Sequence, residues 1–248
     1  KQNKELQVLN ASLEDKVQSR TEELKEAAGM LEVAYEELKL SYITATEVFS
    51  SLINKRLPAN RQPNAKVIAL VKAYAEYHQL DEELSQNLYM AAALYNLGKL
   101  SWPDELFTAP SDLLPKEQRL EYLKYPVNSE QLLMALEPLK ETARIIRQEK
   151  WNGYGVPERL EGTEIPLGSR ILRLAVDFIE LQCGLILERR VSRDNALKLI
   201  KRYRDRLYDP EIADRFLEVC IEVAPDVEHE DPDIAALDTL RLKAGMVL

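Results

Sequence analysis

The sequence predicts an all-α fold, in which a helical bundle is preceded by one long coiled-coil helix. Three observations support this prediction. Apolar residues recur at helical spacing along most of the chain, prolines and glycines divide the pattern into segments of helix length, and no strand-like alternation rises above background before residue 224. An apolar content of 46% in 248 residues is enough for a sizeable core. We expect the bundle to occupy residues 51–223.

Residues 1–50 carry the pattern of a coiled-coil dimerisation helix. An apolar residue recurs every three or four positions, and charged residues fill most of the others. The apolar seam consists of Leu6, Leu9, Leu13, Val17, Leu24, Ala27, Leu31, Ala34 and Leu38, with Arg20 at a stutter between its two halves. A helix this long and this polar is not stable alone. We therefore expect a homodimer through residues 1–50, with folding back onto the same chain as the alternative.

Prolines, glycines and capping residues divide residues 51–223 into shorter helices. The seam continues past Ser41 as a broader apolar face, and Pro58 is expected to end the first helix. Helices are then predicted over residues 64–78, 82–97, 116–124, 127–136, 140–150, 167–190, 195–207 and 211–223, with loops at 101–115 and 151–166. Ser192 and Asp194 are N-cap candidates for the helix at 195–207. Residues 224–248 are expected to be an acidic connector and the start of a truncated C-terminal module.

The composition argues against several classes of protein. A net charge of −9 argues against a nucleic acid polymer as the partner, because phosphate binding needs a basic face. Residues 189–206 are basic nevertheless, either as a solvated helix face or as an anion site. No apolar run approaches the ~20 residues of a membrane span, so membrane insertion is not expected. Cys183 and Cys220 lack metal-ligand spacing and are expected to be buried, reduced thiols, which favours a cytoplasmic location.

Two stretches of the chain carry motifs. The first, AAALYNLGKL, covers residues 91–100, and the second, RQEKWNGYGVPERLEGTEIPLGSRILRLAVDF, covers residues 147–178. Both resemble the signature blocks of the HD-GYP family, all-helical phosphodiesterases that hydrolyse cyclic di-GMP at a centre of two or three metal ions. The resemblance covers residues 41–221 and implies an HD-domain-like helical bundle. Residues 13–27 are similar to the connectors of HD-GYP response regulators, which implies an input domain upstream.

The resemblance also implies that the metal ligands of the family are replaced in this sequence. The His–Asp pair that names the family falls on Tyr95 and Asn96, and the GYP triplet reads GVP. The other ligand positions fall on Pro63, Tyr125, Arg147, Gln148 and Val176, and Glu149 is kept. The chain has only two histidines, His78 and His229, whereas such centres use several imidazoles together with bridging carboxylates. We therefore expect neither a metal nor another cofactor.

Some residues of the signature blocks remain. Lys99 would contact a substrate phosphate by resemblance, and an exposed charge at a helix end is the alternative. The interaction loop of Trp151, Asn152, Gly153, Tyr154, Gly155, Val156 and Pro157 is expected to be rigid, because its glycines reach backbone angles closed to other residues. It would display Tyr154 and Val156 for a protein contact, unless it only closes the core. A GGDEF-type diguanylate cyclase is the partner that the resemblance suggests.

Three hypotheses for the function follow. The first is a catalytically inactive HD-GYP-type signalling module, a pseudo-phosphodiesterase in cyclic di-GMP signal transduction that acts by dimerisation and protein contacts. The second is an effector that binds cyclic di-GMP without hydrolysing it, with Lys99, Arg147 and the basic residues 189–206 holding the phosphates. The third is a phosphohydrolase with an atypical metal site of carboxylates such as Glu149, Asp104 and Glu180.

Overall fold

The computed structural model of the chain describes residues 2–147, 150–155 and 159–223. The ordered elements among these residues are helices, with no β-strand, which confirms the all-α prediction. The chain divides into two compact units, Lys1–Ala45 and Thr46–Leu248. The predicted acidic connector at 224–248 lies outside the described residues. Within the described part of the chain, no helix is both long and apolar enough to cross a lipid bilayer.

The long N-terminal helix α1 spans Gln2–Asn54 without a break. In the part of α1 that belongs to the first unit, the apolar seam is open to solvent, including Leu9, Leu24 and Leu31. In the last turns of α1 one face becomes buried, with Ile53 fully covered. The helix ends four residues before Pro58, close to the predicted end.

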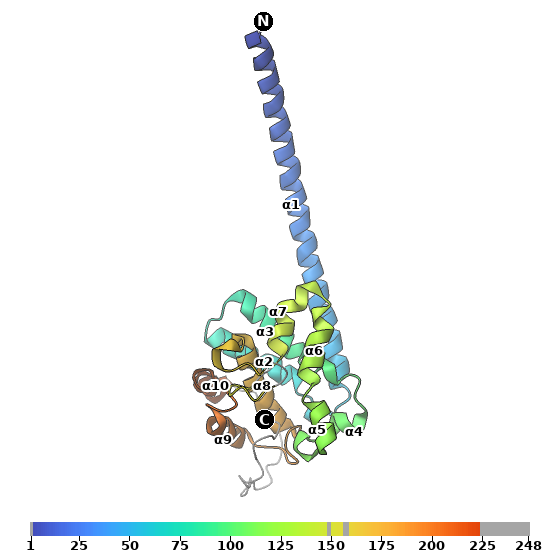
Figure 1. Ribbon diagram of the computed structural model, residues 1–248, viewed down its shortest axis with the longest axis vertical. Helices are drawn as coiled ribbons and strands as arrows, with labels where there is room; N and C mark the ends of the chain where they lie inside the picture. Colours follow the sequence, from blue (N-terminus) through green and yellow to red (C-terminus); the bar gives the residue numbers. More distant parts are fainter. Residues whose placement is uncertain (1, 148–149, 156–158, 224–248) are drawn as a thin grey trace. The chain divides into compact units, whose positions relative to one another are not determined.

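The centre of the second unit is built from four helices, whose order along the chain can be followed in Figure 1. They are α2 (Asn64–Tyr77), α3 (Glu82–Leu94), α8 (Leu167–Cys183) and α10 (Pro210–Val223). Helix α2 packs against the other three, and α3 also packs against α8. Apolar residues occupy most positions of α8, so this helix is buried on nearly all sides.

Smaller helices surround this centre. They are α4 (Asp104–Thr108), α5 (Lys116–Tyr122), α6 (Tyr125–Met134), α7 (Lys140–Ile146) and α9 (Arg193–Tyr203). Helix α7 packs against α3, α6 and α8, while α9 packs against α8 and α10. The short 3-10 turn η2, Leu97–Lys99, follows α3 and packs against α6. This turn carries the end of the first sequence motif.

Several helix ends differ from the prediction. The helix predicted over 167–190 ends at Cys183, because Gly184 takes the left-handed conformation (φ 67°) that terminates helices. The segment 101–115, predicted as a loop, contains α4, whose first turn places Asp104 and Glu105 at the positive end of the helix dipole. The predictions over 82–97, 140–150 and 195–207 were also too long at their C-terminal ends.

Two predictions about individual residues are confirmed. Ser192 caps α9, since its side chain accepts a hydrogen bond from the backbone N–H of Asn195. Asp194 lies instead in the first turn of that helix. Cys183 and Cys220 are buried free thiols, as their positions in amphipathic segments indicated.

Candidate functional site

The candidate site begins where α3 ends, because the chain turns sharply there against α6. A Cβ atom added to Gly98 would lie 2.3 Å from the carbonyl oxygen of Tyr125, so no larger residue fits in this turn. The hydroxyl of Ser129 accepts from the backbone N–H of Gly98 at 2.7 Å. It also lies 2.9 Å from the carbonyl oxygens of both Tyr95 and Tyr125 and can donate to one of them at a time. The turn is therefore held in place by α6.

Tyr95 is fully buried and points toward helix α8. Its hydroxyl donates a hydrogen bond of 2.9 Å to Oε1 of Glu180, which is 2% exposed. Burial, reinforced by the negative charge of Glu180, raises the pKa of Tyr95 well above the ordinary value of a tyrosine. The phenol is therefore neutral at physiological pH, and a neutral phenol is a poor ligand for a metal ion.

Lys99 is buried beside the same carboxylate. Its ammonium nitrogen lies 3.3 Å from Oε1 of Glu180 and 3.4 Å from the hydroxyl of Tyr122. Four aromatic rings surround this nitrogen, and together with Glu180 we call them the Lys99 cage. The distances from Nζ to the ring centroids are 4.1 Å for Tyr125, 5.0 Å for Tyr122, and 5.9 Å for both Tyr95 and Trp102.

The Lys99 cage decides between two interpretations of the lysine. Lys99 is only 6% exposed, so the alternative of an exposed charge at a helix end is wrong. The ammonium already has a carboxylate partner and several aromatic faces, an arrangement that stabilises a desolvated cation. Whether Lys99 contacts a phosphate stays a prediction, and such a contact would compete with Glu180.

Asn96 faces helix α2 rather than the Lys99 cage. Its Nδ2 donates to Oδ1 of Asn64 at 2.8 Å. In turn, Nδ2 of Asn64 lies 3.2 Å from Oδ1 of Asn96, 2.8 Å from the carbonyl oxygen of Ala93 and 3.0 Å from Oγ of Ser50. Ser50, Asn64 and Asn96 are all buried. We call these three residues the amide clip, because they join α1, α2 and the end of α3.

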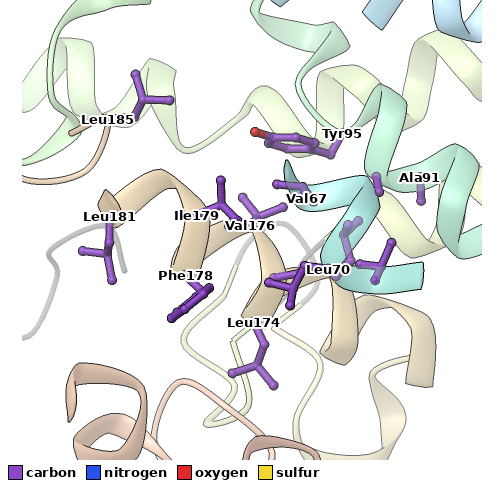
Figure 2. Close-up of a cluster of buried hydrophobic side chains, with 14 of the residues drawn as sticks. Val67, Leu70, Ala91, Tyr95, Leu174, Val176, Phe178, Ile179, Leu181 and Leu185 are labelled. Atoms are coloured by element: carbon purple, nitrogen blue, oxygen red, sulfur yellow. The ribbon is translucent and has the colours of Figure 1, made fainter. Parts of the chain in front are cut away.

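Two further predicted positions, Arg147 and Val176, are held by contacts within the second unit. Nε of Arg147 donates to Oε2 of Glu130 at 2.7 Å. Val176 is 1% exposed and lies in the same cluster of buried apolar side chains as Tyr95 (Figure 2). Its neighbour Asp177 faces elsewhere and accepts a hydrogen bond of 3.0 Å from the hydroxyl of Tyr208. Gln148 and Glu149 lie outside the described residues.

The described part of the interaction loop is attached to the segment between α9 and α10. The backbone N–H groups of Trp151 and Asn152 donate to the carbonyl oxygens of Leu207 and Arg206, at 3.2 and 3.1 Å. Gly153 has a φ of 72°, in the left-handed region that favours glycine. Tyr154 is 81% exposed, whereas Gly155 is buried. Val156 and Pro157, the other predicted members, lie outside the described residues.

The sequence prediction missed several members of this site. Pro63 was aligned with a family ligand, but the side chain that reaches Asn96 belongs to the next residue, Asn64. Ser129 and Glu130, the partners of the η2 turn and of Arg147, carried no motif. Glu180 was considered only as a carboxylate of an atypical metal site. Glu180 lies four residues after Val176, one turn along α8. This spacing places both residues on the same face of the helix and could have identified Glu180 as a member of the site.

The side chains that the structure describes around this site do not fit a catalytic metal centre of imidazoles and carboxylates. Among residues 2–147, 150–155 and 159–223, no group of three or more His, Cys, Asp and Glu side chains is placed to hold a metal ion. His78 has its Nε2 3.2 Å from the carbonyl oxygen of Arg215, away from the motif residues. Asp104 has an exposed side chain paired with Arg56, so it does not share the buried environment of Glu180.

The described part of the second unit is thus an all-α bundle with a polar centre between its helices. A sequence profile described as HD domain matches residues 47–212, and the chain therefore belongs to this family. The match covers α2 through α9 and includes both motifs.

Cyclic di-GMP phosphodiesterases are among the relatives of the chain. A protein named probable cyclic di-GMP phosphodiesterase from Vibrio cholerae is 30% identical over 167 residues, which are 63% of this chain and 38% of that protein. A cyclic di-GMP phosphodiesterase from the same organism is 27% identical over 206 residues, covering 76% and 42%. A cyclic di-GMP phosphodiesterase from Thermotoga maritima is 24% identical over 217 residues, covering 85% and 59%. The chain thus spans between 38% and 59% of the length of these relatives.

A solved structure supports the fold. The crystal structure of a cyclic GMP-AMP specific phosphodiesterase of V. cholerae superimposes with a TM-score of 0.53 and 18% identity. The superposition covers 71% of this chain and 49% of that one. The sequence relatives confirm homology to cyclic di-GMP phosphodiesterases, and the solved structure confirms the all-α fold.

Proposed function

We propose that this chain is a catalytically inactive HD-type signalling module, a degenerate HD-GYP domain in cyclic di-GMP signal transduction. It acts as a pseudo-phosphodiesterase, through self-association and contacts with other proteins, and comes from a response-regulator-like protein. The relatives provide the signalling context, since the three described above are named as cyclic di-GMP phosphodiesterases. The absence of hydrolysis is argued from the residues at the site.

The observation that carries the proposal is the buried pair of Lys99 and Glu180. The carboxylate that could offer oxygen to a cation is already neutralised by a protein ammonium 3.3 Å away and by the hydroxyl of Tyr95. A divalent ion would have to displace a desolvated lysine that four aromatic rings surround. Among the described residues it would gain no imidazole in return, because the side chains that surround Lys99 and Glu180 are phenols and an indole.

Asn96 supports the same conclusion. An amide oxygen carries no charge to hold two divalent ions together, in contrast to a bridging carboxylate. Both ends of this amide are engaged with Asn64, and breaking the pair would leave buried polar groups without partners. Metal binding at this position would therefore cost stability in the amide clip.

Contacts with other proteins are assigned to two surfaces. The first surface is the exposed apolar seam of α1. The rest of that helix is largely charged, so this narrow seam can be buried against the same seam of a second copy of the chain. The interaction loop presents Tyr154 on a backbone fixed by Trp151 and Asn152, and a large exposed aromatic side chain on a rigid support is typical of binding surfaces. A GGDEF-type diguanylate cyclase is the partner proposed for this loop.

Hydrolysis of cyclic di-GMP tests the proposal. The purified chain, incubated with excess Mn²⁺ or Fe²⁺, is expected to release no linear product, while the T. maritima relative serves as the active control. Turnover by this chain that depends on added metal, and that Tyr95→Phe or Lys99→Met abolishes, would overturn the proposal. Calorimetry with cyclic di-GMP separates the effector alternative: heat of binding without turnover would favour it over a purely protein-binding role.

A further inference from the structure

The last turns of α1, which belong to the second unit, carry apolar side chains that are open to solvent. Val48, Phe49 and Leu52 are each about half exposed, at 53%, 48% and 54%. The same turns bury Ser50 and Ile53 on their other side. These turns of α1 therefore have two faces, one packed into the HD domain and one open to solvent.

The open face continues a pattern that begins far upstream in the sequence. Leucine or alanine recurs at every seventh residue, at Leu24, Leu31, Leu38, Ala45 and Leu52. A strict seven-residue repeat is the spacing of helices that pair with another helix, because it keeps one face toward the partner. Val48 lies four residues before Leu52 and continues the series of Ala27 and Ala34 in that seam, and Phe49 lies directly beside it.

The charge pattern indicates which partner fits this seam. Charged residues fill much of residues 22–39, yet none occurs at the repeat positions or at Phe49. A parallel pair of identical helices places each residue opposite its own copy, so any charge on the seam would meet a like charge. From Leu24 to Leu52 the seam carries no charge, which suits pairing with a second copy, and a strongly charged partner would find no complementary group on this part of it.

The amide clip fixes the orientation of this face. Ser50 follows Phe49 directly, and its Oγ accepts from Nδ2 of Asn64, which also pairs with Asn96. This bond and the burial of Ile53 hold the last turns of α1 in one rotation about the helix axis. Val48, Phe49 and Leu52 are consequently kept on the outside.

We propose that a second copy of this chain packs against Phe49 and Leu52, so that the dimer contact reaches the HD domain and ends beside the amide clip. This inference rests on the self-association assigned above and extends it by a specific surface. Without this surface, the proposed self-association would be confined to the part of α1 in the first unit, up to Ala45, which we call the stalk.

Disulfide trapping tests this surface. In a parallel pair, Leu52 faces its own copy, and a disulfide requires Cα atoms about 4.4–6.8 Å apart. Leu52→Cys is expected to give a covalent dimer under mild oxidation, and Leu38→Cys should do the same in the stalk. Leu40→Cys is the matched control, because Leu40 is exposed but lies off the repeat. The native thiols do not interfere, since both are buried.

The outcomes separate this inference from the proposed function. Cross-linking at positions 38 and 52 but not at 40 supports it. If position 38 cross-links and position 52 does not, the stalk pairs but the contact does not reach the HD domain, and the inference is wrong. If neither position cross-links, and sedimentation shows a monomer, the parallel self-association itself fails.

Discussion

The ammonium of Lys99 lies 3.3 Å from Oε1 of Glu180, with side chains that are 8% and 3% exposed. The two residues come from segments 81 positions apart and meet in the interior of the HD domain. A desolvated ion pair of this kind depends strongly on both partners, because removing one leaves a buried charge uncompensated. The pair therefore gives a direct means of testing how the site is held together.

Lys99→Met is expected to lower the free energy of unfolding by about 3 kcal/mol, since it strands the charge of Glu180. The double variant Lys99→Met with Glu180→Gln should lose less than the sum of the single variants, because neither charge remains. Urea denaturation of the wild type, the two single variants and the double variant measures the coupling free energy between Lys99 and Glu180. Additive losses would show that the two groups act independently, contrary to the geometry.

Gly98→Ala is expected to destabilise the chain by about 3 kcal/mol or more, because the added methyl group would meet backbone atoms of α6. Its Cβ would lie 2.3 Å from the carbonyl oxygen of Tyr125 and 2.8 Å from the backbone nitrogen of Ser129. Gly29→Ala is the control, since nothing lies within 4 Å of its Cβ, and it should gain up to about 1 kcal/mol of helix propensity. Thermal unfolding compares the two variants with the wild type. Equal melting temperatures for Gly98→Ala and the wild type would contradict the close approach of η2 to α6.

The native thiols are expected to resist a disulfide reagent at pH 8. Burial raises the pKa of Cys183 to about 11 and that of Cys220 to about 12, so almost no thiolate is present. Both thiols should react once the chain is unfolded in guanidinium chloride. Tyr154→Cys supplies an accessible control, because Tyr154 is 81% exposed and should react at once. Rapid reaction of the native wild-type chain would contradict the burial of these cysteines.

Lys150 is expected to make the stability of the chain rise between pH 8 and pH 10. Burial, together with the nearby charge of Arg173, lowers the pKa of Lys150 from 10.5 to about 8. In this interval the unfolded chain binds more protons than the folded one, so the free energy of unfolding increases by up to about 1.4 kcal/mol per pH unit. Above pH 10, the raised pKa of buried Tyr95 acts in the opposite direction.

Lys150→Met isolates this contribution. The difference between wild type and variant in urea denaturation should change steadily from pH 8 to pH 10, as the wild type gains stability that the variant cannot gain. A constant difference over that interval would show that Lys150 keeps an ordinary pKa.

The helices of the HD domain could be predicted because their signal is local. Helical spacing of apolar residues, Pro58 and Ser192 each act within a few positions. The end of α8 was placed too late because Leu185 and Ile186 continue the apolar pattern, while the conformation of Gly184 overrides it. Local patterns thus predict that a helix is present more reliably than they predict the residue at which it ends.

The partners within the site could not be predicted in the same way. The motif marked Tyr95, Asn96 and Lys99, but their partners Glu180 and Asn64 are distant in sequence, and periodicity carries no information about such pairs. The alignment to Pro63 was one residue away from Asn64, and at the start of a helix one residue decides which side chain faces the interior. Three-dimensional packing was needed to identify the Lys99 cage and the amide clip.

Metal content tests most directly whether side chains of the chain itself fill the place of the catalytic cations. The purified chain is incubated anaerobically with excess Fe²⁺ and Mn²⁺, desalted, and analysed by plasma mass spectrometry beside the T. maritima relative. We expect no stoichiometric metal in this chain and bound metal in the relative. A full equivalent of Fe or Mn per chain, lost in Tyr95→Phe or Asn96→Ala, would contradict it.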